Sequence, residues 1–393
     1  MSARWDLVVV GAGPAGSAAA LGALHAQPDL SVLLLDRSDF PRDKACGDGV
    51  APQVLDVLAG VGVHGLLDDR IPVERLRLRS TGAAVSRTMA RPAYVVPRRL
   101  LDARMRDAAV AAGATVGRHR VRVVQAEADQ VRVDDLRAAV VVGADGAHSE
   151  VARRLSGGGP RHPVPGSRTA LAIRGYAPVR VADAGAQSIV FGPGVQPSYA
   201  WSFDRGDGLA NVGYGELLRA GHPAPGRARL VEQVERLLPG ATVGGTEWRG
   251  HHLPLSSWRW RQPTGRCLLA GDAAHLINPM TGEGIYYAVT TGVLAGRAAA
   301  VALRADGGRS AGRRHARAVS TVLSGHLRHT SLAARLVSFP HVARAGIRAA
   351  ADDQRVFDAL VDLGLAQGRI TPRVAGSLVR ALAVAGRAPE RVC

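Results

Sequence analysis

Cys46 and Lys44 are the two residues whose types most directly suggest chemistry. They lie in FPRDKACGDGV, residues 40–50, where Lys44 is the only lysine of the chain and Cys46 is one of three cysteines. Proline and glycine residues in and beside this stretch predict a tight loop. A thiol can donate a proton, and we expect Lys44 and Arg42 to make the loop electropositive and to lower the pKa of the thiol. Two simpler interpretations stay open, in which Cys46 is a small buried residue and Lys44 is a solvated charge.

The elements before this loop predict a dinucleotide site. A buried strand over Leu7–Val10 leads into Gly11, Gly13 and Gly16 at G-x-G-x-x-G spacing, and an alanine-rich helix follows. This spacing allows a tight turn, a close approach to a pyrophosphate and close packing of helix on strand. Asp36 ends the second strand twenty residues after Gly16, where its carboxylate can accept a hydrogen bond from a ribose hydroxyl. This motif alone does not distinguish FAD from NAD(P).

Two further strand-to-loop turns favour the larger ligand. Residues 138–155 contain another buried strand, which ends in Asp145 and Gly146, and a helix that begins near residue 149. Residues 265–300 form a third strand that ends in Gly271 and Asp272, then a short loop and a glycine-rich helix start. Three such turns fit a ligand held by its adenosine end, its diphosphate and its ring.

The sequence resembles the FAD-dependent oxidoreductases with the fold of p-hydroxybenzoate hydroxylase. Within them it is most similar to the geranylgeranyl reductase family, which includes the menaquinone side-chain reductases. The resemblance covers about the first 300 residues and rests on GAGPAG (11–16), LLLDR (33–37), FPRDKACGDGV (40–50), VVPRRLLD (95–102), VGADGAHS (142–149) and LLAGDAAHLINPMTGEGI (268–285). It implies an α/β fold: a Rossmann-like (GR2-type) FAD-binding domain, an inserted antiparallel β-sheet domain for the substrate, and C-terminal helices.

The resemblance also implies roles for residues of the FAD site. Asp36 would hold the adenosine ribose, Arg98 would contact FAD, and Asp272 would bind the ribityl chain or the diphosphate. Asp145 and Gly146 would line the pyrophosphate region. Arg98, which adjoins Arg99, has a second interpretation as a surface charge. The full predicted set is Gly11, Gly13, Ala15, Gly16, Asp36, Arg37, Cys46, Gly47, Arg98, Asp145, Gly146, Gly271, Asp272, Pro279, Gly282, Glu283, Gly284 and Ile285.

Alternating apolar and polar residues predict an antiparallel sheet over about 165–255, extended by strands near 73–96, with a hairpin at Asp204–Gly208. Tyr199, Trp201 and Phe203 occupy alternate positions, so a strand would place them on one face. The resemblance implies that they line a substrate tunnel, and ordinary sheet core is the alternative. Asp204 stands where the family usually has proline, which leaves the shape of the tunnel and a polyprenyl substrate open.

The predicted domain boundaries follow from these elements. The FAD-binding domain comprises 1–72, 97–160 and 265–304, the substrate sheet comprises 73–96 and 161–264, and 305–393 is a helical region. Its Arg-rich amphipathic helices break near Pro340 and Pro372. Packing on the FAD domain and contact with a membrane surface are the two interpretations of these helices.

Composition limits the other function classes. The net charge of +17 comes from scattered arginines without a basic tail, which argues against nucleic acid as a partner. The cysteines lack paired spacing, and His251 and His252 would point to opposite faces of a strand, so we expect neither a disulfide framework nor a metal site. We find no leader and no apolar run of the roughly 18 residues that a spanning helix needs. A cytoplasmic protein is expected, with peripheral contact at the inner face of the membrane as an alternative.

These observations favour an FAD-dependent oxidoreductase. In the resembled family the loop at 40–50 passes the flavin ring, so Cys46 would donate a proton to a carbon-carbon double bond after hydride transfer from flavin N5. Lys44 would favour the reduced flavin or a nicotinamide phosphate. The substrate would be an apolar small molecule, isoprenoid or polyketide-like, and NAD(P)H would be the electron donor. Two alternatives remain: a monooxygenase that acts through C4a-hydroperoxyflavin, and a non-enzymatic flavin or lipid carrier.

Overall fold

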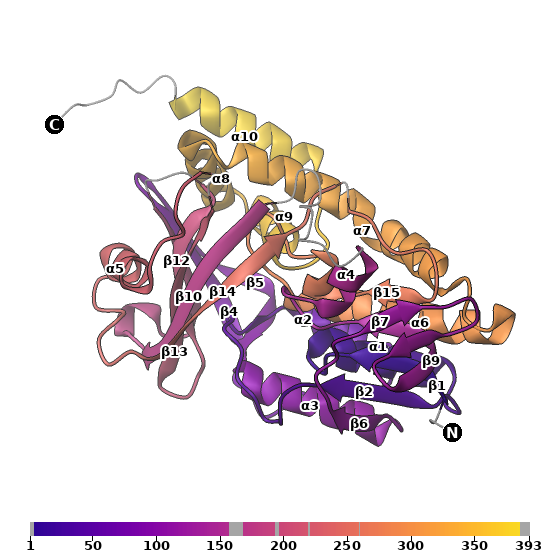
Figure 1. The fold of residues 1–393 in the computed structure, drawn as a ribbon. Coiled ribbons are helices and arrows are strands. Elements are labelled where there is room, and N and C mark those ends of the chain that lie inside the picture. The colour runs from indigo at the N-terminus through magenta and orange to yellow at the C-terminus, as the bar shows by residue number, and fades with distance from the viewer. Residues whose placement is uncertain (1–3, 157–167, 193–195, 219–220, 259, 386–393) are drawn as a thin grey trace.

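Two β-sheets and a set of C-terminal helices make up the protein (Figure 1). The computed structural model describes residues 4–156, 168–192, 196–218, 221–258 and 260–385. The first sheet lies at one end of the molecule and the second at the other, and the C-terminal helices run along one side of both. The predicted α/β fold class is confirmed.

The first sheet has the order β6-β2-β1-β9-β8-β7, and β15 also pairs with β9. Its strands are β1 (Arg4–Val10), β2 (Val32–Asp36), β6 (Thr115–Arg118), β7 (Val124–Ala126), β8 (Val131–Val133), β9 (Leu136–Gly143) and β15 (Cys267–Leu269). β6, β2, β1, β9 and β15 are parallel, so their carboxyl ends share one edge. The three glycine-rich turns and Asp36 all follow these ends, and the sheet therefore gathers them at one site.

Helices cover the first sheet. They are α1 (Pro14–Ala26), α2 (Pro52–Ala59), α3 (Arg98–Ala111), α4 (Glu150–Leu155) and α6 (Ile285–Asp306), with a short 3₁₀ helix η2 (Gly271–Ala274). α6 is long and apolar enough to qualify as a membrane span by length and composition, contrary to the expectation from sequence. Most of it is buried, however, because it packs against α1 and α7 (Ala311–Leu336) as a core helix.

α1 and α6 approach each other through small residues. A Cβ added at Gly296 would lie 2.0 Å from the carbonyl oxygen of Ala19, and one at Gly292 would lie 2.2 Å from that of Ala15. The backbones therefore touch directly at these positions. This contact fixes the N-terminus of α1, and with it the first glycine-rich turn, relative to residues 282–284, after which α6 begins.

We predict that Gly296→Ala lowers the free energy of unfolding by about 3 kcal/mol, because the added methyl group must separate two packed backbones. Gly346→Ala in α8 (Pro340–Asp352) is the matched control, since a Cβ there meets nothing within 4 Å. That variant is expected to gain up to about 1 kcal/mol from helix propensity. Denaturant unfolding of both variants measures the difference, and equal effects would contradict the α1–α6 contact.

The second sheet has the order β14-β10-β13-β12-β11-β4-β5-β3. Its strands are β3 (Gly49–Val50), β4 (Val73–Ser80), β5 (Ala83–Val95), β10 (Arg168–Pro178), β11 (Ala186–Phe191), β12 (Ser198–Asp204), β13 (Leu209–Leu217) and β14 (Thr246–Leu255). All pairs are antiparallel except β4 with β11. The predicted hairpin joins β12 to β13, and the 3₁₀ helix η1 (Val181–Asp183) and α5 (Arg227–Leu237) complete this part. The predicted domain division stays a prediction. The strand β3 lies outside its substrate segment.

The C-terminal helices pack on both halves. Besides α7 and α8 they are α9 (Gln354–Leu365) and α10 (Pro372–Ala385), so the predicted breaks near Pro340 and Pro372 are found. α7 packs on α6 and β15, as expected for the FAD domain, but α8 and α9 pack on β4 and β5. Ile347 and Phe357 share a core there with Leu76 and Met89. The expectation that these helices pack on the FAD domain is therefore correct for α7 and for the end of α9, where Asn278 and Thr281 donate to carbonyl oxygens of α9, but not for α8.

Candidate active site

Residues of both sheets line one large cavity. Its volume is about 1210 Å³, above the roughly 300–1,000 Å³ usual for small-molecule pockets. Residues from all three glycine-rich turns, from the loop at 40–50, from the second sheet and from the C-terminal helices line it. Every residue of the predicted FAD and substrate sets except Gly16 and Gly271 lies on its wall. The structure thus brings together nearly all of the predicted site residues, and their roles stay predictions.

The loop at 40–50 is fastened to the first sheet by Arg42. One guanidinium nitrogen of Arg42 lies 3.1 Å from the carboxylate of Asp102, which is fully buried, and the other lies 3.7 Å from that of Asp36. Asp102 also accepts two hydrogen bonds from Arg98, at 2.6 and 2.9 Å. Arg98 is 5% exposed, so its alternative interpretation as a surface charge is wrong.

The next residue of the loop reaches the second sheet. The carboxylate of Asp43 lies 2.6 Å from the guanidinium of Arg174 on β10 and 3.3 Å from that of Arg249 on β14. Arg174 is among the largest fully buried side chains of the described chain. Because a buried charge needs a partner, this pair ties the loop firmly to the second sheet.

Lys44 makes the third ion pair, back to the first sheet. Its ammonium donates to the carboxylate of Asp272 at 2.9 Å, across 228 positions of sequence. Burial opposes ionisation of Asp272, but the charge and the hydrogen bond of Lys44, together with the nearby His251 and Arg98, outweigh it, and the pKa of Asp272 is lowered. The interpretation of Lys44 as a solvated loop charge is therefore wrong. The single lysine joins the second strand's loop to the third glycine-rich turn.

Asp48 anchors the far end of the loop through a buried cluster. It lies in the left-handed region at φ 59° and is fully buried. Its carboxylate accepts from the hydroxyl of Tyr176 at 2.5 Å and from the amide of Asn211 at 2.9 Å. Asn211 also donates to the carbonyl oxygen of Cys46 at 2.8 Å and accepts from the indole of Trp201 at 2.8 Å. This cluster fixes the backbone of the thiol relative to the aromatic strand.

The thiol of Cys46 is protonated at neutral pH. Burial raises the pKa of Cys46, and the nearby positive charge of Arg98 offsets this only in part. The expectation that Lys44 and Arg42 lower this pKa is wrong, because both side chains are paired with carboxylates. A protonated thiol that faces a cavity is a proton donor rather than a nucleophile.

The FAD end of the cavity fits a diphosphate. Among the residues that the structure describes, no side chain caps α1, and its first turn holds no acid. A Cβ at Gly13 would lie 3.1 Å from a guanidinium nitrogen of Arg42, 3.8 Å from a carboxylate oxygen of Asp102 and 3.9 Å from a guanidinium nitrogen of Arg98, so two cations and one anion face this turn. Positive charge and unpaired helix N–H groups therefore meet at this turn, which is the arrangement that binds phosphate. The carboxylate of Asp36 accepts from Ala12 N and Ser38 N at 2.9 Å each, which holds it at the cavity edge.

In the second glycine-rich turn, at Asp145 and Gly146, the carboxylate holds a helix start. Asp145 accepts from the backbone N–H of Glu150 at 2.6 Å and of Val151 at 3.2 Å, and it thereby holds the start of α4. Burial raises its pKa. Gly146 has a positive φ of 81°, and a Cβ there would meet nothing within 4 Å, so the cavity is open beside it.

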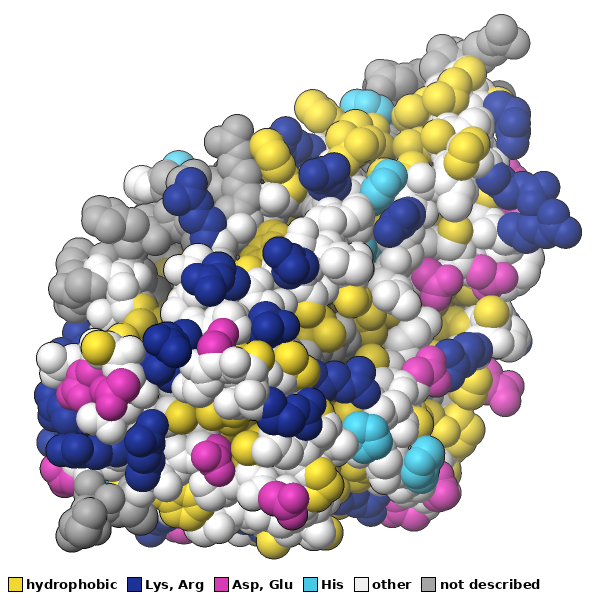
Figure 2. Space-filling view, turned by 90° about the vertical axis from the view of Figure 1, so that its right-hand side faces the viewer, with side chains coloured by type: hydrophobic (Ala, Val, Ile, Leu, Met, Phe, Trp, Pro, Cys, Tyr) yellow, Lys and Arg dark blue, Asp and Glu magenta, His cyan; other side chains and the backbone are white. Residues whose placement is uncertain are grey.

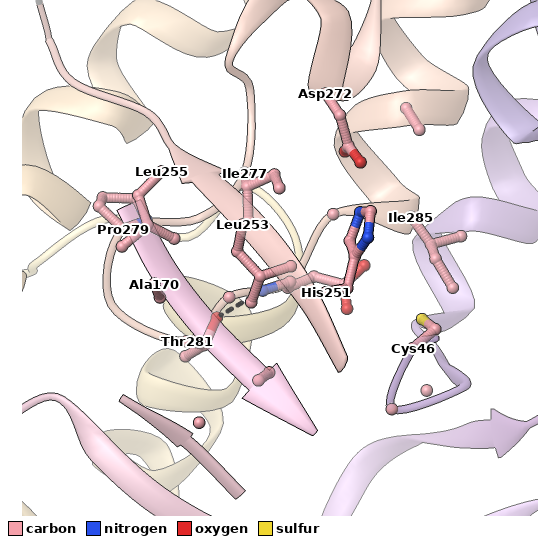
Figure 3. A pocket seen from close by; sticks show the side chains of 18 of the residues that line it. Cys46, Ala170, His251, Leu253, Leu255, Asp272, Ile277, Pro279, Thr281 and Ile285 are labelled. Carbon is pink, nitrogen blue, oxygen red and sulfur yellow. Dashed lines mark hydrogen bonds between the residues drawn. The ribbon is translucent and has the colours of Figure 1, made fainter. Parts of the chain in front are cut away.

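Residues 279–285 line the part of the cavity where the sequence predicts the ring of FAD. Burial raises the pKa of Glu283 to about 7, although the backbone N–H of Tyr286 donates to it at 3.0 Å. The hydroxyl of Tyr199 donates a hydrogen bond to the carbonyl oxygen of Thr281. This bond joins β12 to residues 279–285. Figure 3 shows His251 projecting from β14 into the space between Asp272 and Cys46. Burial lowers the pKa of His251 to about 4, so it is neutral there.

The aromatic side chains of β12 line one wall. Ring centroids are 6.0 Å apart for Tyr199 and Trp201 and 6.3 Å apart for Trp201 and Phe203, so the three share one face as predicted. All three line the cavity. Trp201 is also buried against Gly213, so sheet core and cavity wall are both correct descriptions of it. Asp204 follows Phe203 at the end of β12. Its carboxylate accepts hydrogen bonds from the backbone N–H groups of Gly185 and Gly206, and it thereby shapes the hairpin.

Sequence reasoning missed the partners of the loop. Asp102 ends the motif VVPRRLLD but received no role, and Arg174 and Asn211, which also hold the loop in place, belong to none of the motifs. The alternating charges in the stretch Arg-Asp-Lys were the available signal. Among the described residues, no group of three or more His, Cys, Asp or Glu side chains could hold a metal ion.

We predict that Asp48 makes the folded state more stable as the pH falls from neutral. Burial raises the pKa of Asp48 from 3.8 to about 6. Its contribution is therefore fully present below the unfolded pKa and is lost as the pH rises through the folded pKa. As the pH falls from about 7 to about 5, the free energy of unfolding of the wild type should therefore rise by about 1 kcal/mol relative to that of Asp48→Asn.

Chemical unfolding at several pH values measures this difference. Asp56→Asn is the matched control, because a hydrogen bond from Arg91 lowers the pKa of that partly exposed carboxyl. Its contribution is lost only at lower pH, so its difference from the wild type should stay constant over this range. A constant difference for Asp48→Asn as well would contradict the prediction.

Comparisons with known proteins agree with this geometry. The FAD binding domain family matches residues 4–165 and 241–318. The chain is 37% identical over 322 residues to a menaquinone reductase of Mycolicibacterium smegmatis, covering 75% of this chain and 76% of that protein. It is 32% identical over 326 residues to digeranylgeranylglycerophospholipid reductase 1 of Methanopyrus kandleri, covering 77% and 82%.

Solved structures show the same fold. A geranylgeranyl bacteriochlorophyll reductase-like protein of Thermoplasma acidophilum has a TM-score of 0.74 and 21% identity, covering 98% of this chain and 97% of that one. The anhydrotetracycline hydroxylase OxyS of Streptomyces rimosus has a TM-score of 0.67 and 21% identity, covering 92% and 75%. The fold is therefore shared by a reductase-like protein and by a hydroxylase.

Proposed function

Because the chain belongs to the geranylgeranyl reductase family of FAD-dependent oxidoreductases, we propose that it reduces a carbon-carbon double bond of an isoprenoid substrate. The relatives above 30% identity are named as reductases, which favours this reaction over the hydroxylation named for OxyS and over a carrier without activity. We propose NAD(P)H as the electron donor. The observation that carries the proposal is the position of Cys46, whose pKa burial raises, in the same cavity as the FAD turns and the aromatic wall.

The residues of the chain fit FAD. The uncapped N-terminus of α1, with Arg42 and Arg98 beside Gly13, would hold the diphosphate. Asp36 would bind the adenosine ribose, and the turn at 282–285 would border the ring. The Lys44–Asp272 pair lies between the loop and this turn, so it would fix the distance from Cys46 to the ring. When bound, FAD supplies a hydride to one carbon of the double bond.

Cys46 would supply the proton to the other carbon. The thiol holds its proton at Sγ because burial raises its pKa, and the negative charges of Asp48 and Glu283 act in the same direction. The hydride and the proton together convert the double bond to a single bond, and the thiolate is then reprotonated from water. The walls at Tyr199, Leu253 and Ile277 would hold the apolar chain and exclude water from the reacting carbons.

A single-turnover experiment tests the reaction. The FAD-loaded protein is reduced without oxygen and mixed with geranylgeraniol, and the return of oxidised-flavin absorbance is followed by stopped flow. We expect reoxidation by geranylgeraniol and none by its fully saturated counterpart. If neither alcohol reoxidises the flavin, while oxygen with the alkene yields a hydroxylated or epoxidised product, the chain is a monooxygenase.

We predict that Cys46→Ala slows this alkene-dependent reoxidation by about 100-fold or more, the usual range for loss of a general acid. Reduction of the flavin by NADPH or NADH should stay unchanged, because that step needs no thiol. The matched control is Cys267→Ala, which removes a buried thiol of β15 that does not line the cavity. Equal alkene rates in both variants and the wild type would remove Cys46 from the mechanism.

A further inference from the structure

The cavity opens at the C-terminal helices. Leu332 on α7 and Val379 on α10 both line it, yet they are 48% and 64% exposed, so they mark its mouth. Phe339, between α7 and α8, is 55% exposed. We call Leu332, Phe339 and Val379 the apolar rim. Large apolar side chains in water are costly, and a group of them beside a cavity marks a surface that meets an apolar partner.

The part of the cavity behind the apolar rim is itself apolar. Side chains of α7, α8, α9 and α10 line it, among them Leu336, Val337, Val342, Phe357 and Leu378. The same cavity continues to Tyr199 and Cys46. An apolar path therefore leads from the rim to the thiol.

Positive charge surrounds the apolar rim. Residues 307–351, which include α7 and nearly all of α8, contain eight arginines and neither Asp nor Glu. Arg328 and Arg335 are exposed on α7, and Arg380 is exposed on α10. Figure 2 shows hydrophobic side chains gathered at the top of that face, the end of the molecule at which α10 lies, with basic and His side chains beside them.

We propose that α7, α8 and α10 dock the protein on an anionic lipid bilayer, with the apolar rim inserted and the arginines on the lipid headgroups. An apolar centre bordered by cations is the pattern of proteins that bind at the membrane interface. A second copy of the chain fits this face less well, because a symmetric dimer would place its arginines against one another. This inference rests on the proposed function in one respect, that an isoprenoid lipid would pass from the bilayer to Cys46 through the mouth.

A vesicle flotation experiment tests the docking face without any turnover. The FAD-loaded protein is mixed with vesicles of phosphatidylcholine alone or with added phosphatidylglycerol. We expect binding to the anionic vesicles that weakens with salt. Arg335→Gln should weaken the partition coefficient roughly fivefold, and Arg328→Gln by a similar factor. Phe339→Ser should weaken it roughly tenfold.

Matched controls lie in α5 and in the loop that follows it, outside the docking helices. Val243→Ser removes a valine that is 71% exposed between α5 and β14, and Arg229→Gln removes an exposed arginine of α5. Both controls should bind vesicles like the wild type. The inference is overturned if Phe339→Ser and Arg335→Gln bind as well as these controls, or if they change the molecular mass in solution instead of vesicle binding.

The docking face and the proposed reaction fail separately. Neither Phe339 nor Arg335 lines the cavity, so alkene-dependent reoxidation with detergent-solubilised geranylgeraniol should be unchanged in both variants. Vesicle binding without any alkene turnover would refute the reductase and leave the docking face intact. Alkene turnover in a wild-type protein that ignores anionic vesicles would do the reverse.

Discussion

Three successive charges in one loop hold the two halves of this protein together around the site. Arg42 pairs with Asp102 of α3, Asp43 pairs with Arg174 of the second sheet, and Lys44 pairs with Asp272 after β15. Each of these partners is at least partly buried, so the pairs are poorly screened by water and a missing partner would leave a costly charge inside. The position of Cys46, two residues after Lys44, follows from this constraint. We call the three ion pairs of Arg42, Asp43 and Lys44 the clamp. The clamp holds the loop beside the predicted ring site.

Burial then decides what the titratable groups can do. The same loop that looks electropositive in sequence has its cations neutralised by carboxylates, so desolvation dominates and the pKa of Cys46 is raised. Burial likewise raises the pKa of Glu283 to about 7 and that of Asp48 to about 6. A cavity that stabilises neutral forms suits an apolar substrate and a thiol that gives up its proton only during reaction.

Local patterns were enough to predict the FAD part, because a strand, a glycine turn and a helix are contiguous in sequence. The alternate aromatics of β12 were predictable for the same reason, since a strand fixes which side chains share a face. The clamp was not, because Lys44 and Asp272 are 228 positions apart and nothing local pairs them. The error in the Cys46 pKa and the misplacement of α8 share this origin. Both depend on tertiary contacts, with Asp102 and Asp272 in one case and with β4 and β5 in the other.

The central claim is that the clamp places the Cys46 thiol between the flavin ring and an apolar chain. A crystal structure of the protein with FAD and an unreactive, saturated isoprenoid alcohol tests it most directly. The account predicts the ring beside residues 282–285, the chain running from the aromatic wall toward the C-terminal helices, and Cys46 Sγ within about 4 Å of the chain carbon that lies over the ring. A thiol that faces away from the chain, or a chain bound outside this cavity, would contradict it.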